Sequence, residues 1–479
     1  MQLLLLLAFM RLLSEASVSA MTNPFSYEAT TKGEQRLVVI LVQFPDVRST
    51  TTPQVIQQRL RELDAYYREA SYGQAWVTSR LVEKWYQISA SLAQLDIQKW
   101  DYDREDMSKL RTESIRIADP EINYRDYDYV MIIAAGRVWA NAYSSLPVTT
   151  NDGVRSLHIA VANERSEMGV YAHELGHLLP SNYAPWKGRG LPDLYNYDTA
   201  KENSSREPFV GPWDIMDDDK PARHFSAYSK IMLGWIIPET VRPTATQLFI
   251  FTIQPLEKSA DVRVVKIPIG SEAYYLIEVR RKLGFDRVLP EEGIVIYRVD
   301  DSKKSGYGIV RVVDRNSATK TLNDAAFRTE DRFEDNGVYI LVILNDGSGF
   351  TIGISGRDPS RFDADADGIP DVEEVRRGTD RFKYDTDGDL WPDGIDLAPT
   401  NPFLPNALIA ALIMIAVGAI VVIRRRRITP QEYAPKPTPP EPLVKRYCMN
   451  CGAEMQFSTT YCQKCGTKQS YADDTAHTL

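Results

Sequence analysis

Five consecutive residues near the middle of the chain could bind a catalytic metal ion. They read His173-Glu174-Leu175-Gly176-His177, an example of the HExxH pattern. In a helix, residues i and i+4 lie on one face, so the two histidines can offer imidazole nitrogens to one zinc ion, with Glu174 beside them. Zinc lowers the pKa of a bound water to about 7, and the carboxylate can pass the proton of that water to a leaving amine. The pattern predicts a zinc hydrolase, although it also occurs in buried helices whose histidines are only structural.

The residues after the second histidine indicate the class of zinc enzyme. In the metzincin pattern HExxHxxGxx(H/D), a glycine turns the chain so that a third ligand follows six residues after the second histidine. Here Pro180 occupies the place of the glycine. A glycine and a carboxylate follow later, in residues 190–195 (GLPDLY), and residues 211–216 (GPWDIM) look like a turn that places a methionine beneath the metal.

With these residues the chain resembles the M6 family of metallopeptidases, of the immune inhibitor A type, whose motif HExxHxxGxPDxY is followed by a W-D-x-M turn. Four further segments are similar to blocks of that family: residues 37–46, 67–73, 224–235 and 275–290. The resemblance therefore extends over roughly residues 33 to 355 and is far more specific than HExxH alone. It implies a metzincin-like fold and the hydrolysis of peptide bonds in proteins.

The resemblance also implies a role for each site residue. His173, His177 and Asp193 would bind the catalytic zinc, Glu174 would be the general base, and Met216 would be the Met-turn residue. The insertion at residues 181–189 departs from the family pattern and leaves other third ligands open, namely Asp198, Glu202, Glu207 and Asp214. The same insertion could line the cleft and set specificity for one membrane-proximal partner.

Four other residues could take part in the chemistry or serve only as packing residues. Tyr195 and Tyr228 could stabilise a tetrahedral oxyanion, but in a chain with 25 tyrosines they can equally be packing residues. His158 lies in a strand-like segment and His224 leads a short helical segment. We expect both histidines to be structural.

The elements that must position the zinc site are predicted from hydrophobic periodicity. Residues 36–44 and 129–135 are apolar runs of strand length, as expected for strands buried on both faces. A helix begins after Thr52-Pro53 and ends near residue 71, and the zinc helix extends from about residue 166 to 179. Strands alternating with helices predict an α/β catalytic domain, which we place at residues 33–240.

The pattern changes after the catalytic segment. Short β-branched and aromatic runs separated by turn residues predict a β-sandwich domain at residues 245–357. The predicted strands are residues 248–253, 262–267, 274–279, 293–299, 338–344 and 350–354. The sequon Asn203-Ser204-Ser205 could carry a glycan.

Two acidic loops at residues 361–398 predict calcium sites. Oxygen ligands fall at loop positions 1, 3, 5, 9 and 12, which is the spacing that calcium loops use. In the first loop these are Asp363, Asp365, Asp367, Asp371 and Glu374, and in the second Asp385, Asp387, Asp389, Asp393 and Asp396. The pair resembles thrombospondin type 3 or dockerin-like repeats, whereas an acidic linker without ions would not explain the same spacing twice. Calcium would turn the segment into a stiff spacer.

Two apolar segments predict export and a membrane anchor. Residues 1–20 begin with leucines and end in Val18-Ser19-Ala20, typical of a signal peptide, although an uncleaved anchor would read similarly. Residues 403–423 are long enough for one transmembrane helix. Four arginines at residues 424–427 mark the cytoplasmic side, so the C-terminus would be inside and the catalytic domain outside.

The C-terminal segment predicts a second zinc site. A basic and proline-rich linker, residues 424–446, leads to a zinc ribbon at residues 447–468. Its two CxxCG motifs contain the only cysteines of the chain: Cys448, Cys451, Cys462 and Cys465. Four thiolates at this spacing suit a tetrahedral structural zinc, and a disulfide pair is the alternative. A cytoplasmic position, where thiols stay reduced, agrees with the predicted topology.

The sequence as a whole predicts a single-pass membrane metallopeptidase that needs catalytic Zn²⁺, structural Zn²⁺ and Ca²⁺. Its 479 residues, with 43% hydrophobic residues and a formal charge of −9, suit several folded domains and do not indicate nucleic-acid binding. We expect a protein or peptide substrate and a cytoplasmic protein partner for the ribbon. The alternative is an inactive cell-surface adhesin or sensor that keeps the peptidase fold and signals through the ribbon.

Overall fold

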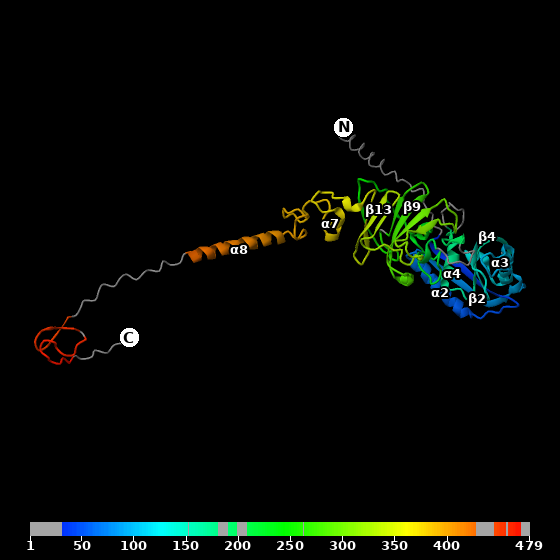
Figure 1. Ribbon diagram of the computed structural model, residues 1–479. Helices are drawn as coiled ribbons and strands as arrows, with labels where there is room; N and C mark the ends of the chain where they lie inside the picture. Colours follow the sequence, from blue (N-terminus) through cyan, green and yellow to red (C-terminus); the bar gives the residue numbers. More distant parts are fainter. Residues whose placement is uncertain are drawn as a thin grey trace, which may run out of the picture. The chain divides into compact units, whose positions relative to one another are not determined.

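The protein consists of two compact units, Met1–Pro402 and Phe403–Leu479 (Figure 1). The structure, a computed structural model, describes residues 31–151, 153–180, 190–198, 208–261, 263–427, 445–456 and 458–470. The predicted signal peptide, the insertion at residues 181–189, the sequon and most of the proline-rich linker lie outside the described residues. As expected at the level of fold class, the chain is mixed α/β with several sheets.

The predicted zinc helix lies against a five-stranded sheet with the strand order β2-β1-β3-β5-β4. Its strands are β1 (Gly33–Gln43), β2 (Ala75–Gln87), β3 (Tyr129–Ala134), β4 (Asn141–Thr150) and β5 (Gly153–Asn163). Strands β2, β1, β3 and β5 are parallel, and β4 pairs antiparallel with β5 at one edge. The two buried strands predicted from apolar runs are confirmed as β1 and β3.

Helices cover both faces of this sheet, and the alternation of side chains along β1 shows how. Leu37, Val39 and Leu41 pack in one cluster with helices α2 (Pro53–Ala70) and α4 (Met168–Gly176). The intervening residues Val38, Ile40 and Val42 pack in a second cluster with helix α3 (Arg104–Ala118). Successive strand residues point to opposite faces, so a strand covered on both sides must be apolar throughout.

Two further sheets follow, with the strand orders β11-β10-β9-β8-β6 and β12-β13-β14-β7. Their strands are β6 (Glu239–Thr240), β7 (Phe249–Ile253), β8 (Val264–Pro268), β9 (Ala273–Arg280), β10 (Gly293–Asp300), β11 (Val310–Val312), β12 (Arg332–Asp335), β13 (Val338–Asn345) and β14 (Phe350–Ser355). All six predicted strands are present, and β6, β11 and β12 were not predicted. One apolar cluster contains side chains from both sheets, as in a sandwich.

Strand β9 joins this sandwich to the zinc-helix segment. Tyr275, Ile277 and Val279 belong to the cluster between the two sheets. Leu276, on the opposite face, belongs to the cluster that contains the zinc helix and Met216. The two segments therefore share one apolar cluster within the first unit, in addition to the clusters that each has of its own.

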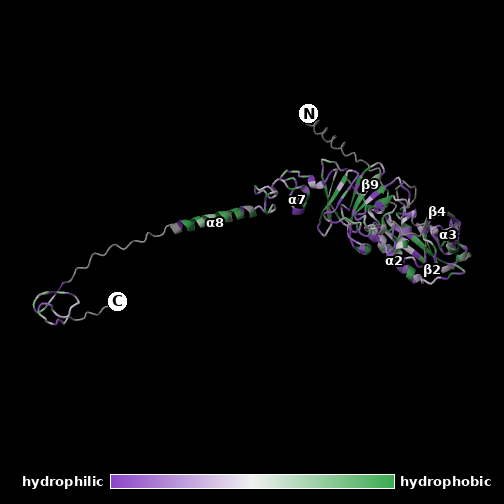
Figure 2. Ribbon diagram, viewed as in Figure 1, coloured by the Kyte–Doolittle hydropathy of each residue, from purple (hydrophilic) through white to green (hydrophobic). Residues whose placement is uncertain are grey.

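In the second unit, helix α8 (Leu404–Arg427) is apolar along most of its length (Figure 2). Its residues Asn406–Arg425 are long and apolar enough to cross a membrane, judged by length and composition. The C-terminal segment forms the short strands β15 (Arg446–Tyr447) and β16 (Glu454–Met455), which pair antiparallel.

Candidate metal centres

The structure brings His173, His177 and Asp193 together. His173 lies in α4, His177 directly follows its last residue, and Asp193 arrives from the segment beyond the insertion. The Nε2 atoms of the two histidines are 3.1 Å apart, and Asp193 Oδ1 lies 3.3 Å from His173 Nε2 and 3.2 Å from His177 Nε2. Zinc–ligand bonds of about 2.0–2.1 Å in a tetrahedron put ligand atoms about 3.3 Å apart. The three atoms therefore fit one zinc ion, with a fourth position left for water or substrate.

Backbone carbonyls orient both imidazole rings. His173 Nδ1 lies 2.9 Å from the carbonyl of Ile215, and His177 Nδ1 lies 2.7 Å from the carbonyl of Leu191. When each Nδ1–H donates to its carbonyl, the Nε2 lone pair is left facing the third ligand. This tautomer is the one that metal binding requires.

Gly190 makes the position of Asp193 possible. A Cβ at residue 190 would lie 2.1 Å from the carbonyl oxygen of His177 and 2.6 Å from that of Gly176, so only glycine fits there. The next residue, Leu191, donates its N–H to the Gly176 carbonyl at 3.0 Å. The chain thus returns to the end of α4 after the insertion, and this return brings the carboxylate to the histidines.

Tyr197 supports the third ligand and was not predicted. Its hydroxyl donates a short hydrogen bond to Asp193 Oδ2, which leaves Oδ1 facing the histidines. The ring of Tyr195, one of the two predicted oxyanion residues, lies 6.2 Å from that of His173 and lines the cavity. Tyr228, the other predicted residue, is buried in the core. In the sequence, only its position two residues after Tyr195 pointed to Tyr197.

The alternative third ligands do not join the histidines in the described residues. Asp198 carries an exposed N–H bonded to the side chain of Asn196, and Glu202 and Glu207 lie outside the described residues. Asp214 is fully buried and accepts hydrogen bonds from Met216 N, Ser226 N, Ser226 Oγ and Ser229 Oγ at 2.5–2.9 Å. Its role is to hold the loop that carries Ile215, whose carbonyl orients His173.

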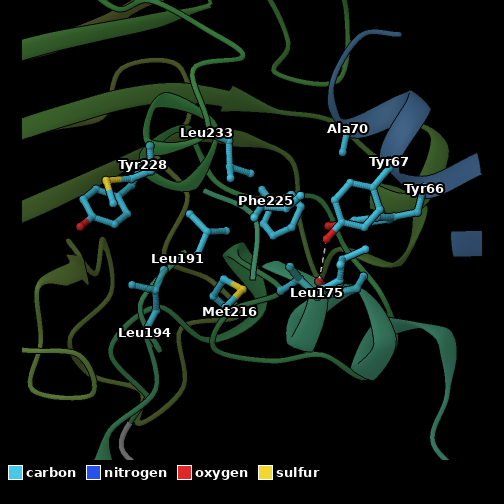
Figure 3. Packing of buried hydrophobic residues seen from close by; sticks show 14 of the residues in the cluster. Tyr66, Tyr67, Ala70, Leu175, Leu191, Leu194, Met216, Phe225, Tyr228 and Leu233 are labelled. Atoms are coloured by element: carbon cyan, nitrogen blue, oxygen red, sulfur yellow. Dashed lines mark hydrogen bonds between the residues drawn. The ribbon is translucent and has the colours of Figure 1, made fainter. Parts of the chain in front are cut away.

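Met216 lies under the zinc helix. Its side chain is fully buried, and a Cβ built on Gly176 would be 3.2 Å from its sulfur atom. Figure 3 shows Met216 among Leu175, Leu191 and Leu194. The methionine therefore packs against the last turn of α4.

Burial and neighbouring charges shift the pKa values of the site. Burial raises the pKa of Glu174 to about 7, although the two histidines oppose this shift. Burial lowers the pKa of His173, but the hydrogen bond with Asp193 and the charges of Glu174 and Asp193 outweigh burial and raise it to about 10. The histidine charges lower the pKa of Asp193 far below its usual value, against burial. The three zinc-site side chains thus interact strongly through charge and hydrogen bonds.

A cavity of about 890 Å³ opens beside these residues. Glu174 lines it together with His173, His177 and Asp193. Ala140 also lines it, as do Asn141, Ala142 and Ser144 from the start of edge strand β4. Its aromatic wall consists of Trp100, Tyr102, Trp139, Tyr195, Tyr197 and Tyr307. Several of these rings meet edge to face, for example Trp100 with Tyr197 at 5.0 Å between centroids. The site can thus receive a ligand much larger than a water molecule.

The two acidic loops adopt the same backbone arrangement. Asp363 in the first loop and Asp385 in the second each accept the N–H five residues later, at 3.2 and 2.8 Å. The structure groups Asp363, Asp365 and Asp367 in the first loop and Asp385, Asp387 and Asp389 in the second, with ligand atoms within 4.8 Å. These oxygens fit a hard cation such as calcium. Burial and the charges of Asp365 and Asp367 raise the pKa of Glu374 to about 7.

The predicted ligands at loop position 9 have a different role in their own loops. Asp371 Oδ1 accepts the N–H of Ala364 at 2.7 Å, and Asp393 Oδ1 accepts that of Thr386 at 2.9 Å. Each carboxylate therefore closes its loop onto position 2. Asp371 also pairs with Arg381 and is not grouped with other metal-binding side chains among the described residues. Asp396 likewise is not in such a group, although its Oδ2 is buried without a hydrogen bond.

The four cysteines form one cluster with free thiols. Cys448 and Cys465 have sulfur atoms 3.7 Å apart, and those of Cys451 and Cys462 are 3.6 Å apart. Zinc–sulfur bonds of about 2.3 Å in a tetrahedron give sulfur separations of about 3.7 Å. The cluster therefore fits a structural zinc, whereas each of these pairs is far longer than a disulfide bond of about 2.05 Å.

Comparisons with known proteins add no identification. A scan against models of protein families found no match to this chain, and a search of the curated proteins also found none. The chemistry of the chain must therefore be inferred from its own residues.

Proposed function

We propose that the protein is a membrane-anchored extracellular zinc metalloendopeptidase of the M6 type, with a metzincin-like catalytic domain. The observation that carries the proposal is the convergence of His173, His177 and Asp193 on one point, beside Glu174 and at the wall of a large cavity. A structural histidine pair would not need an open side, a third ligand and an adjacent carboxylate of raised pKa together.

Glu174 is the proposed general base. When bound, zinc supplies an acidified water and a Lewis acid for the scissile carbonyl. The Glu174 carboxylate accepts a proton from the attacking water and donates it to the leaving amine. A pKa of about 7 suits both steps, since a group that titrates near neutral pH can take and release a proton with little penalty. Met216 packs under the helix and acts by positioning it.

The shape of the cavity supports an extended polypeptide as substrate. Strand β4 is an edge strand, and its first residues line the cavity. An edge strand has unpaired N–H and C=O groups, with which an extended peptide can form main-chain hydrogen bonds. The aromatic wall would then contact the side chains of the substrate and exclude water. Recognition through the main chain is suited to cleavage within proteins.

The order of the segments supports the proposed location. Helix α8 ends in Arg424–Arg427, and arginines beside an apolar span favour the cytoplasmic side. The cysteine cluster follows on that reducing side, where thiolates remain available for structural zinc. The catalytic unit and the calcium loops precede the helix and would lie outside. We propose that the ribbon binds a cytoplasmic protein.

The test uses the full chain, purified in detergent and loaded with zinc. We expect cleavage of an unfolded protein substrate that stops when a zinc chelator is added. Glu174→Ala should keep the zinc but lose at least about 99% of the activity, because general base catalysis contributes about 10²–10⁴-fold. Glu167→Ala is the matched control, since Glu167 is exposed at the start of the same helix and its side chain caps nothing. Bound zinc without turnover in the unmodified chain would contradict the proposal and favour the inactive sensor.

A further inference from the structure

A third acidic group lies between the two loops and was not predicted from the sequence. It consists of Asp367 and Glu374 of the first loop and Asp393 of the second, with ligand atoms all within 4.8 Å of one another. The sequence spacing predicts Asp393 as a ligand of the ion in its own loop. The structure instead places its carboxylate beside the carboxylates at positions 5 and 12 of the preceding loop.

Two of these three side chains are buried without a compensating positive charge. Glu374 is 0% exposed and Asp393 is 1% exposed, and neither forms an ion pair within the described part of the chain. Glu374 Oε2 is buried and has no hydrogen-bond partner, although Oε1 accepts one from Thr379. An isolated buried carboxylate is strongly unfavourable in free energy unless a cation or several donors compensate it. The unpartnered oxygen of Glu374 is therefore available to bind a cation.

The residue that matches Asp393 in the first loop shows the contrast. Asp371 has the same loop position and the same hydrogen bond to position 2, and it is equally buried. Its second oxygen, however, is 3.2 Å from the guanidinium of Arg381. The second oxygen of Asp393 instead accepts the hydroxyl of Thr386 at 2.5 Å. One position-9 carboxylate is thus neutralised by an arginine, whereas the other has only neutral donors and faces two more carboxylates.

The two loops are also packed too closely for a side chain to separate them. A Cβ at Gly394, next to Asp393, would lie 2.4 Å from the carbonyl oxygen of Asp367. Glycine at this position lets the second loop approach the first at the level of the acidic group. This close approach is independent of the charges and puts Asp393 within reach of a common ion.

We propose that Asp367, Glu374 and Asp393 bind one divalent cation together, so that the second loop completes the cation site of the first. Calcium is the ion that fits, because its oxygen ligands lie 2.3–2.6 Å away and two ligands of one ion can be up to about 5 Å apart. The ion links the two loops across their contact and compensates the buried carboxylates. The pair of loops then becomes rigid as one body when calcium binds, rather than as two independent loops.

The test measures calcium binding by titration calorimetry on the full chain in detergent, with zinc kept in excess. The background carries Asp385→Asn and Asp387→Asn, which weaken the second loop's own site and leave the shared group intact. In this background, Asp393→Asn should lower the calcium affinity of the shared site at least about tenfold, since calcium affinity depends on the number of charged ligands. Asp371→Asn is the matched control, because asparagine can still accept the loop-closing N–H; we expect a change below about threefold. Equal effects of the two substitutions would overturn the proposal.

A second measurement does not depend on that background. In the otherwise unchanged chain, calcium affinities are compared for Asp393→Asn, Glu374→Gln and the double variant. Two ligands of one ion should be coupled, so the effect of Asp393→Asn should change at least about threefold when Glu374 is already glutamine. Additive effects would mean that the two carboxylates serve different ions, and would overturn the proposal.

Discussion

Replacing Gly190 by alanine is expected to disable the zinc site without changing a ligand. The new Cβ would lie 2.1 Å from the carbonyl oxygen of His177 and 2.6 Å from that of Gly176. Normal carbon contacts are about 3.5 Å, so the overlap exceeds 1 Å and involves backbone atoms at the end of α4 that cannot rotate away. The segment after residue 190 must therefore move outward by about 1 Å.

This outward shift should lower both the stability of the fold and the affinity for zinc. Forcing backbone apart in a packed core costs about 3 kcal/mol of folding free energy. Asp193 lies three residues further on, and metal–ligand distances tolerate only about ±0.2 Å. A displacement of 1 Å should therefore remove its carboxylate from the zinc, and we expect zinc affinity to fall at least tenfold.

The assay combines a zinc titration with denaturation followed by tryptophan fluorescence. Gly270→Ala is the matched control, because a Cβ there would be 3.7 Å from its nearest neighbour, the Cβ of Ala273, and that is an ordinary contact. The control should keep its zinc affinity and its denaturation midpoint. If Gly190→Ala behaves like Gly270→Ala, the return of the chain onto α4 is not what positions Asp193, and our account of the site fails.

Three other predictions address the loop behind the site, its titration and the second calcium loop. Asp214→Asn should cost about 3 kcal/mol of folding free energy and lower zinc affinity, because an amide cannot accept all four hydrogen bonds that hold the loop of Ile215. A denaturation series and a zinc titration measure the two effects. Zinc affinity should rise at least tenfold between pH 6.5 and 9, because zinc binds the neutral ring of His173 and the pKa of this ring is raised to about 10. The raised pKa also stabilises the zinc-free fold. That stability is fully present below the pKa of the unfolded chain, about 6.5, and is lost as the pH rises towards 10. A flat zinc titration over this range would contradict the charge balance at the site. Leu390→Gly should raise the free energy of unfolding in the absence of calcium by about 1 kcal/mol. Leu390 has φ +80° and is 91% exposed, so glycine relieves backbone strain and loses little packing. A lower melting temperature of the variant would show that this strain is absent.

The fold was predictable where local patterns decide it. The apolar run in β1 is explained by helices on both faces of its sheet, and the six longer strands of the later sheets were visible from short β-branched runs. The spacing of His173 and His177 placed two imidazoles on one helix face, because that spacing needs only helical geometry. Such features depend on neighbours in sequence, which a single chain shows directly.

What the sequence did not reveal depends on contacts between distant residues. Tyr197 holds Asp193 only because the chain turns back at Gly190, and one tyrosine among many carries no such signal. The equal spacing of Asp371 and Asp393 in their loops suggested equal roles. Their environments differ because Arg381 pairs with the first and the preceding loop faces the second.

The shared core explains why the two later sheets belong to the same unit as α4. Arg280, in strand β9, is fully buried and donates to the carbonyl of Trp213 at 2.6 Å. Its charge is balanced by Glu278 and Asp286 at 3.0 and 2.6 Å. Trp213 begins the turn whose Ile215 carbonyl orients His173, so a sheet of the sandwich fixes the backbone that orients this histidine. Positioning of this kind favours a sandwich that supports the zinc site over one that acts only as a spacer, because a spacer would not need a buried arginine aimed at the turn.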